Sequence, residues 1–162
     1  MEKDDLKSVY DLSCLLHADL PESESVLTEK LRLSPQSCWC LIEADRIVGY
    51  AFTHPWLLRH IPALDHFLDE IPAKADCLYL HDIALLPQMR GRGALRDLFH
   101  LVLGAAKQFN LLHLALTCVH GYEALWAHYG FMHQEQTHTA AALATYGEGA
   151  CYMIRDLSAR ME

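Results

Sequence analysis

A basic, glycine-rich turn is the strongest chemical signal in the sequence. The stretch LYLHDIALLPQMRGRGALRDL, residues 78–98, begins as an apolar run, stops at Pro87, and then holds three arginines and two glycines within residues 90–96. At the start of a helix, free backbone N–H groups and the helix dipole favour a bound anion. Glycine lets the backbone approach that anion closely, and arginine adds forked donors. The turn therefore predicts a phosphate cradle, with a tight turn carrying solvated arginines as the alternative.

The charge of this segment is opposite to that of the whole chain. The 162 residues carry a formal net charge of −8, yet residues 87–107 hold four basic side chains and one acidic side chain. A small anion could bind at this segment while the acidic remainder attracts a cationic substrate. The overall acidity argues against a nucleic acid partner, because binding a phosphate backbone requires a basic face.

Two stretches resemble motifs of the GCN5-related N-acetyltransferases (GNAT). IALLPQMRGRGAL, residues 83–95, is similar to motif A, in which a strand leads into the glycine turn. LTCVHGYEALWAHYGF, residues 116–131, is similar to motif B, a strand followed by a short helix that ends in aromatic-x-x-x-Gly-Phe. The resemblance covers roughly residues 6–156. It implies transfer of an acetyl group from acetyl-CoA to a primary amine, of a small molecule, by direct attack in a ternary complex.

The spacing of motif A fixes which residues the resemblance assigns to acetyl-CoA. Counting from the apolar pair places the Gln/Arg position on Arg90 and the first glycine on Gly93, while Leu95 stands where relatives have Gly or Ala. A competing frame starts at Gln88 and uses Gly91 with Gly93. In this family the turn holds the pyrophosphate and the central strand pairs with the pantetheine. The cofactor-binding residues implied here are Ala84, Leu85, Arg90, Gly91, Arg92, Gly93, Ala94, Leu95 and Trp126.

The resemblance also implies a general base on the central strand. LHDIAL resembles the LHxLAV strand of the arylalkylamine N-acetyltransferases, and His81 falls on one of their base histidines. A neutral imidazole has a pKa suited to removing a proton from an amine. Asp82 is the alternative base, or else an acceptor for loop N–H groups, and His81 could equally be a core histidine. Strand alternation predicts one face with Tyr79, His81 and Ile83 and another with Leu80, Asp82 and Ala84.

The sequence indicates the proton donor to the leaving thiolate less clearly than it indicates the general base. Trp126 stands where many relatives carry a tyrosine, and an indole donates a hydrogen bond without acting as an acid. Tyr129, water, or no acid at all are the remaining options. Cys118 could serve as a nucleophile, although a buried apolar cysteine is the commoner role. These departures leave two alternatives open: an acyl-CoA-binding protein with lost or altered catalysis, and a protein or peptide N-acetyltransferase.

The remaining sequence predicts the elements that position these residues. Helical spacing favours helices over 6–18, 22–33, 94–108 and 121–131, and a short helix around 63–71 in the loop 55–76. Strands are expected at 38–43, 46–54, 77–86, 111–119, 131–137 and 150–156, possibly with one more before residue 6. We predict an α/β (α+β) fold of the GNAT type in one domain, residues 1–162. Its mixed, mostly antiparallel sheet has about six to seven strands flanked by helices, with splayed central strands.

Composition argues against disulfide-linked, metal-binding, membrane-spanning and secreted classes of protein. The six cysteines include no C-x-x-C pair, so they are expected to be reduced core thiols, and the scattered histidines predict no metal site. No apolar run is long enough to span a bilayer, and the N-terminus lacks the layout of a secretion signal. The sequence therefore predicts a cytoplasmic protein without a membrane partner. Exposed edge strands make a homodimer possible.

Overall fold

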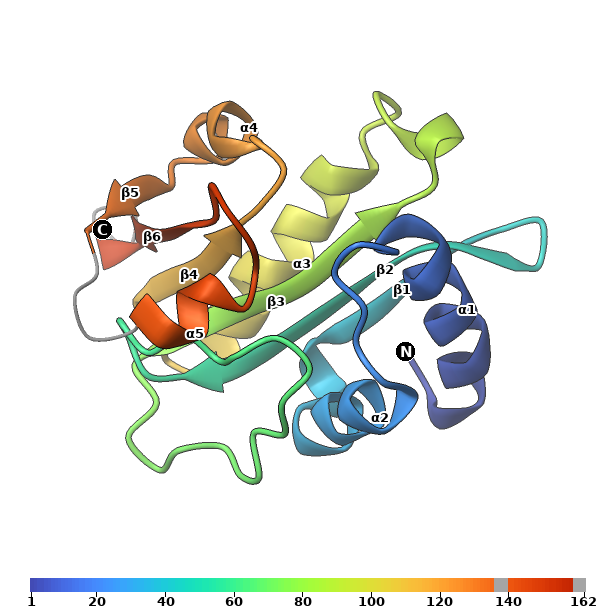
Figure 1. The fold of residues 1–162 in the computed structure, drawn as a ribbon. Coiled ribbons are helices and arrows are strands. Elements are labelled where there is room, and N and C mark those ends of the chain that lie inside the picture. Colours follow the sequence, from blue (N-terminus) through green and yellow to red (C-terminus); the bar gives the residue numbers. More distant parts are fainter. Residues whose placement is uncertain (136–139, 159–162) are drawn as a thin grey trace.

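A six-stranded sheet forms the centre of the protein (Figure 1). The computed structural model describes residues 1–135 and 140–158. The spatial order of the strands is β1-β2-β3-β4-β6-β5, and every neighbouring pair is antiparallel except β3 with β4. The strands are β1 (Cys38–Glu43), β2 (Arg46–Trp56), β3 (Cys77–Leu85), β4 (His113–Cys118), β5 (Met132–Gln134) and β6 (Cys151–Asp156). The predicted mixed, mostly antiparallel sheet is confirmed, with six strands among the described residues.

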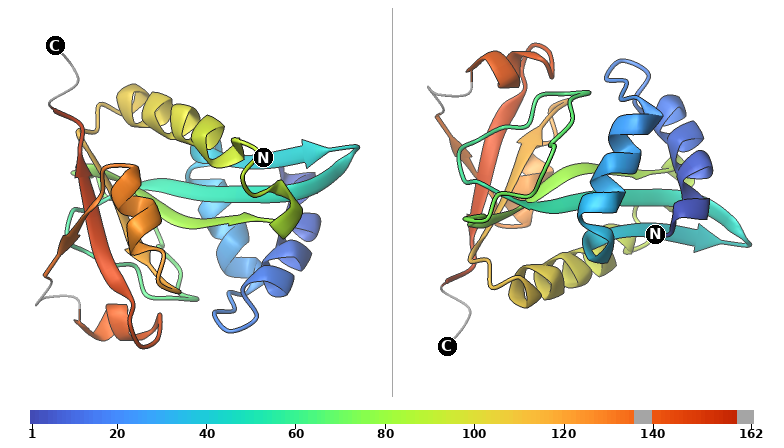
Figure 2. Two further views of the ribbon diagram at one scale, coloured as in Figure 1. Left: turned by 90° about the horizontal axis from the view of Figure 1, so that it is seen from above. Right: turned by 90° about the horizontal axis from the view of Figure 1, so that it is seen from below.

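Helices cover both faces of this sheet (Figure 2). The α-helices are α1 (Leu6–Leu16), α2 (Glu24–Leu33), α3 (Ala94–Gln108), α4 (Glu123–His128) and α5 (Ala140–Ala144), and the 3-10 turns are η1 (Lys3–Asp5), η2 (Pro35–Ser37) and η3 (Pro87–Met89). Helix α1 buries Leu6, Val9 and Leu12, which share one face at helical spacing. Helices α1 and α2 pack on one face of β1–β3, whereas α3 packs on the opposite face against β3 and β4. None of the helices in the described ranges has the length and apolarity that a bilayer crossing requires.

The central parallel pair opens along its length. Only Leu78–Leu80 of β3 pair with 114–116 of β4, although β3 continues to Leu85 and β4 continues to Cys118. The last part of β3 therefore has β2 on one side and no strand on the other. This splayed geometry agrees with the predicted one, and it leaves backbone groups of β3 available to a ligand.

A β-bulge at His81 changes which side chains share a face. Phe52 of β2 pairs with Asp82 while the next residue, Thr53, pairs with Leu80, so His81 is an extra residue in β3. Both His81 and Asp82 consequently point toward the α1–α2 side, whereas Ile83 packs with the cluster on the α3 side. The predicted strict alternation through this strand is wrong, because a bulge shifts every later side chain by one position.

The segment between β2 and β3 contains no helix. The sequence predicts a short helix around 63–71, but Asp65 and Asp69 have φ values of +54° and +65°, which a right-handed helix cannot accommodate. Side chains of the α2 region hold this loop instead, as described below. The possible strand before residue 6 is the turn η1, and helix α5 lies in a segment to which the sequence assigned no helix or strand.

Candidate functional site

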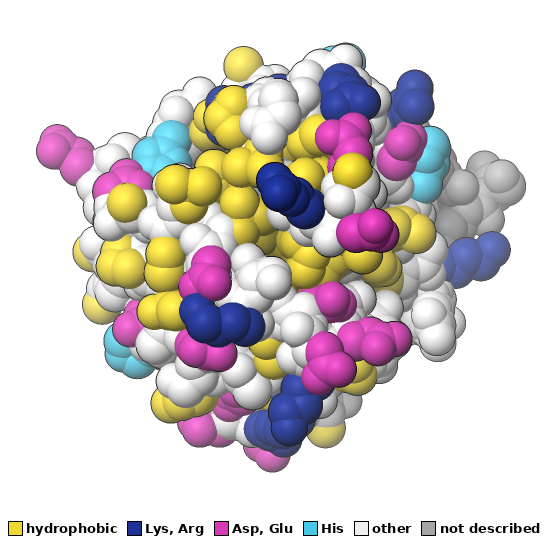
Figure 3. Space-filling model, turned by 90° about the vertical axis from the view of Figure 1, so that its right-hand side faces the viewer, with side chains coloured by type: hydrophobic (Ala, Val, Ile, Leu, Met, Phe, Trp, Pro, Cys, Tyr) yellow, Lys and Arg dark blue, Asp and Glu magenta, His cyan; other side chains and the backbone are white. Residues whose placement is uncertain are grey.

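A cavity of about 600 Å³ lies where β3 and β4 diverge. Its volume falls in the usual range for a small-molecule site. Figure 3 views the side of the molecule from which η3 and the β1–β2 hairpin project, and it shows hydrophobic side chains gathered in a hollow with charged side chains around it. The cavity is lined by Leu16, His17, Ile83, Ala84, Leu85, Met89, Arg90, Gly91, Gly93, Ala94, Leu95, Arg96, His120, Tyr122, Leu125, Trp126, His128 and Tyr129.

The glycine turn forms one end of this cavity. Gly91 and Gly93 have φ values of +71° and +86°, in the left-handed region that favours glycine. Gly93 is the residue before α3, a helix of 15 residues, so the free N–H groups of its first turn lie at the cavity. The sequence predicted this arrangement because proline, glycine and the start of an amphipathic helix are local signals.

The three arginines of the turn differ in what they contact. Arg92 lies 2.9 Å from Glu43 on the β1–β2 hairpin, and Arg96 lies 3.0 Å from Asp97. Arg90 lines the cavity and makes no salt bridge with the described residues. Arg92 is not among the lining residues. The geometry therefore favours Arg90 as the cation available to an anionic ligand.

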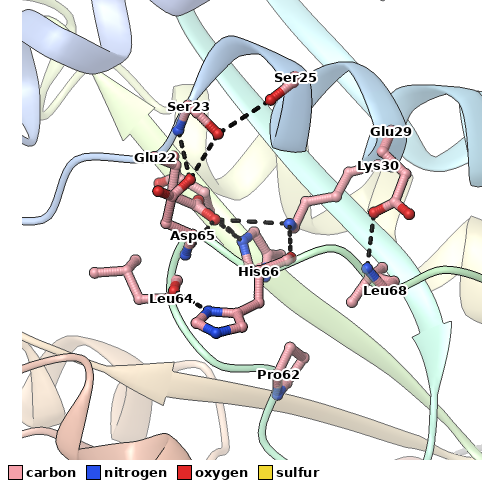
Figure 4. A network of polar contacts seen from close by, with 12 residues as sticks. Glu22, Ser23, Ser25, Glu29, Lys30, Pro62, Leu64, Asp65, His66 and Leu68 are labelled. Carbon is pink, nitrogen blue, oxygen red and sulfur yellow. Dashed lines mark hydrogen bonds and ion pairs between the residues drawn. The ribbon is translucent and has the colours of Figure 1, made fainter.

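His81, predicted from the resemblance as the base, does not line the cavity. Its side chain is 1% exposed, and its Nε2 lies 2.9 Å from the buried Glu22 carboxylate. Glu22 also lies 3.6 Å from Lys30 Nζ, which donates a hydrogen bond to the His66 carbonyl (Figure 4). His81 Nδ1 is buried without a hydrogen-bond partner in the described part of the chain. This histidine is placed as a core residue, the second of the two roles that the sequence allowed.

The same network fixes the loop between β2 and β3 to α2. The Ser23 backbone N–H and hydroxyl both donate to Asp65, and Glu29 accepts from the backbone N–H of Leu68 (Figure 4). Glu29 also accepts from the backbone N–H of Asp69. The Asp65 carboxylate is therefore engaged within the protein.

Glu22→Gln is expected to lower the free energy of unfolding by about 3 kcal/mol at pH 7, because Lys30 would keep a buried charge without its partner. Burial raises the pKa of Glu22, but the charges of His81 and Lys30 outweigh burial and lower that pKa from 4.5 to about 2. The contribution of Glu22 is therefore present above pH 4.5 and is lost as the pH falls toward 2. Urea denaturation across this pH range should show the free energies of unfolding of Glu22→Gln and of the parent protein converging as the pH falls. Glu24→Gln, at an exposed position of α2, is the control; equal losses for both variants at pH 7 would contradict the expectation.

His17 is a polar side chain that does reach the cavity, and it is paired with Asp82. His17, at the end of α1, places Nε2 3.1 Å from the Asp82 carboxylate, whose other oxygen accepts a hydrogen bond from the Tyr50 hydroxyl at 2.7 Å. Asp82 raises the pKa of His17 above its ordinary value, against burial, which lowers it. An imidazole held by a carboxylate and facing a cavity is suited to proton transfer.

His120 lies beside this pair on the turn that follows β4. The rings of His17 and His120 are stacked, with centroids 6.5 Å apart, and His120 Nε2 lies 2.7 Å from Asp19. The contact joins the α1–α2 connection to the β4–α4 turn across the cavity. Neither His17 nor His120 was predicted as a site residue, because α1 and the turn come together only in the folded chain. The available signal was the helical apolar spacing of α1, which continues to Leu16 next to His17.

Motif B supplies the opposite wall of the cavity. Trp126 and Tyr129 line it, and both rings pack against Phe99 of α3, with centroids 6.3 Å and 4.2 Å away respectively. Cys118 does not line the cavity, and burial raises the pKa of its thiol to about 12. The structure therefore gives Cys118 none of the features of a nucleophile in this cavity.

Comparisons with known proteins agree with this architecture. Residues 6–131 match the model of the acetyltransferase (GNAT) family, whereas a search of the curated proteins found no match. The fold is similar to the GphF GNAT-like decarboxylase in complex with isobutyryl-CoA, with TM-score 0.77, 15% identity and 97% of each chain covered.

Two further solved structures have the same fold. The loading GNATL domain of CurA from Lyngbya majuscula gives TM-score 0.76 and 12% identity over 97% of this chain and 95% of that chain. The ribosomal-protein-S18-alanine N-acetyltransferase from Escherichia coli gives TM-score 0.66 and 18% identity over 98% of this chain and 91% of that chain. The similarity at these identities is one of fold.

Proposed function

Because the chain belongs to the acetyltransferase (GNAT) family, we propose that it transfers an acetyl group from acetyl-CoA to the primary amine of a small molecule. The observation that carries this proposal is that one cavity joins the left-handed glycine turn before α3 to the open edge of β3. The N–H groups of the turn suit a diphosphate. Backbone groups near Ala84 and Leu85 suit an extended pantetheine chain, which would pair as an added strand.

The unequal environments of the arginines give a test of the diphosphate assignment. Arg90→Ala is expected to weaken CoA binding by about tenfold, since a charge-assisted hydrogen bond contributes roughly 1.5–3 kcal/mol. Arg92→Ala removes the same charge from the neighbouring turn position, but Arg92 is engaged with Glu43. We therefore expect a smaller loss for Arg92→Ala in calorimetric titrations with CoA. Equal losses would contradict a specific role for Arg90 and would favour a general effect of charge.

His17 is the proton acceptor in the proposed reaction. With the proton on Nε2, which lies 3.1 Å from Asp82, Nδ1 carries the lone pair that takes a proton from the attacking ammonium or amine. The nitrogen then forms a bond to the thioester carbonyl carbon, and the tetrahedral intermediate collapses with cleavage of the C–S bond. Asp82 orients the imidazole and stabilises its protonated form. This assignment replaces His81, whose ring is buried against Glu22.

Tyr129 remains our candidate for returning a proton to the leaving thiolate. It lines the same cavity, and a phenol can act as an acid whereas the Trp126 indole cannot. Trp126 is assigned to the wall that holds the pantetheine. Water near the exposed rim is the alternative proton donor. The size of the loss in kcat in Tyr129→Phe distinguishes Tyr129 from water in this role.

The direct test is release of free CoA thiol from acetyl-CoA. Purified protein is incubated with acetyl-CoA and a panel of small primary amines and, separately, with peptides bearing free N-termini or lysines. Amine-dependent thiol release and a product heavier by one acetyl group would support the proposal. Turnover on peptides alone would transfer the assignment to a protein N-acetyltransferase, and CoA binding without turnover on either would favour altered chemistry.

A decarboxylase is the second candidate. It is favoured by Leu95 and Trp126, which depart from the acetyltransferase motifs, and by similarity in fold to a GNAT-like decarboxylase. In such a reaction the bond to the carboxylate of a β-carboxyacyl-CoA breaks, CO₂ leaves, and the resulting enolate takes a proton. Malonyl-CoA converted to acetyl-CoA without any amine would support this candidate. Unchanged malonyl-CoA under conditions where acetyl transfer proceeds would exclude it.

A further inference from the structure

Two cysteines and a glutamate converge at the end of β4, outside the cavity. Cys118 is the last residue of β4 and lies directly across the β4–β6 ladder from Cys151, the first residue of β6. Glu123 is the first residue of α4. The two Sγ atoms and a Glu123 carboxylate oxygen all lie within 4.8 Å of one another. We propose that these three side chains form a binding site for a thiophilic divalent cation, Zn²⁺ in particular.

The backbone between the strand and the helix brings the third ligand into place. His120 and Gly121 have φ values of +57° and +72°, so two successive residues adopt the left-handed conformation. This reverses the chain after β4 and places Glu123 over the strand it has just left. The pairing of Cys118 with Cys151 is fixed by a continuous antiparallel register from His113 onward. The positions of the two cysteines and of the Glu123 backbone thus follow from ordered elements.

The chemistry of the three groups selects the cation. Two thiolates and a carboxylate suit zinc, whereas calcium and magnesium require oxygen ligands. Zinc bonds of about 2.3 Å to sulfur and 2.0–2.2 Å to oxygen would hold tetrahedral ligand atoms roughly 3.3–3.8 Å apart. None of the present separations exceeds 4.8 Å, so they need to shorten by at most about 1–1.5 Å, and the exposed Glu123 side chain can move toward the two sulfurs. Cys118 is buried and Glu123 is exposed, so a fourth, solvent position remains for water.

The electrostatics of the cluster also favour a cation. Glu123 makes no salt bridge within residues 1–135 and 140–158. A divalent cation would neutralise the Glu123 carboxylate and take the place of both thiol protons.

Binding at this position would fix one wall of the cavity. Helix α4 has six residues, and none of them is fully buried. The same helix carries Leu125 and Trp126, which line the cavity. A cation that joins the first residue of α4 to β4 and β6 would hold that wall in place without entering the reaction.

Cobalt provides the probe for this site. Protein freed of metal by EDTA, and kept reduced by a phosphine, is titrated with Co²⁺ and then with Zn²⁺. We expect a thiolate-to-cobalt charge-transfer band and the intense d–d bands of a tetrahedral ion, which Zn²⁺ then abolishes. Cys118→Ser and Cys151→Ser should each remove most of the charge-transfer intensity. Cys14→Ser, which alters an exposed thiol on α1, should leave it unchanged.

Glu123→Gln keeps the proposal testable if a cysteine variant fails to fold, since Glu123 is exposed. This variant should bind Co²⁺ at least about tenfold more weakly while retaining the circular dichroism of the parent, because loss of even an outer-shell partner typically costs 10–100-fold. Absence of a charge-transfer band in the parent protein would overturn the proposal. A band that persists in Cys151→Ser, or an affinity unchanged in Glu123→Gln, would overturn it equally.

Discussion

Gly93→Asp is expected to weaken CoA binding by about 100-fold, equivalent to about 2.7 kcal/mol. Gly93 has a φ of +86° and lines the cavity directly before α3. A side chain at this φ is strained, and a carboxylate at the helix N-terminus would compete with the diphosphate for the same N–H groups. Like charges a few ångströms apart at a partly solvated site repel by several kcal/mol. Calorimetric titration of CoA into the folded variant measures the loss.

Gly147 provides a closely matched control. Its φ is +87°, and a Cβ added there meets no atom within 4 Å. Gly147→Asp therefore introduces the same residue into almost the same backbone conformation, between α5 and β6 and away from the cavity. A Cβ at Gly93 would instead meet Arg96 Nη2 at 3.1 Å, so the two variants share only the backbone strain of a positive φ. We expect Gly147→Asp to keep the CoA affinity of the parent protein. If Gly93→Asp also bound CoA with parent affinity, the turn would not be the diphosphate site.

The parts of the fold that the sequence predicted are those encoded locally. A buried apolar run, Pro87, two glycines and an amphipathic segment follow one another within residues 77–108, and each acts on its own neighbourhood. The order of strands and helices could be read in the same way. The short helix expected around 63–71 does not form, because hydrogen bonds from the α2 region hold that loop in a non-helical conformation. The residues that make these bonds are distant in sequence.

The sequence was sufficient to predict a glycine turn before a helix, but it was not sufficient to predict the pairing of His17 with Asp82. The bulge at His81 depends on how β3 pairs with β2, and it turns His81 toward Glu22 with no local signal. His17 and Asp82 meet only because α1 ends over the open part of β3. Cys118 and Cys151 are likewise brought together by the register of β4 and β6, whereas the sequence shows no metal-binding spacing. In each of these examples, contacts between residues distant in sequence determine where the side chains lie.

His17→Gln is expected to lower kcat by about 10²–10⁴-fold, the usual contribution of a positioned general base. Glutamine keeps a polar side chain of similar reach but cannot accept the proton. His100→Gln, an exposed substitution on α3, is the matched control and should leave kcat unchanged. Steady-state rates of thiol release with the best amine measure both. A loss of less than about threefold in His17→Gln would remove His17 from the proposed mechanism.

Asp82→Asn separates proton transfer by His17 from a merely structural role. His17 acts as a base only when neutral, so kcat/KM should rise with pH through the pKa of His17. Asp82 raises that pKa, and removing its charge should therefore move the rise in kcat/KM to lower pH while reducing the maximum rate. A structural role of His17 predicts a lower rate with an unshifted pH profile of kcat/KM.

His81→Gln should neither shift the pH profile nor reduce the maximum rate. The His81 ring lies against Glu22, so we expect a loss of stability with the pH profile of the parent. The expected results differ for the two histidines because the bulge in β3 directs His81 into the core, whereas Asp82 contacts His17 at the cavity.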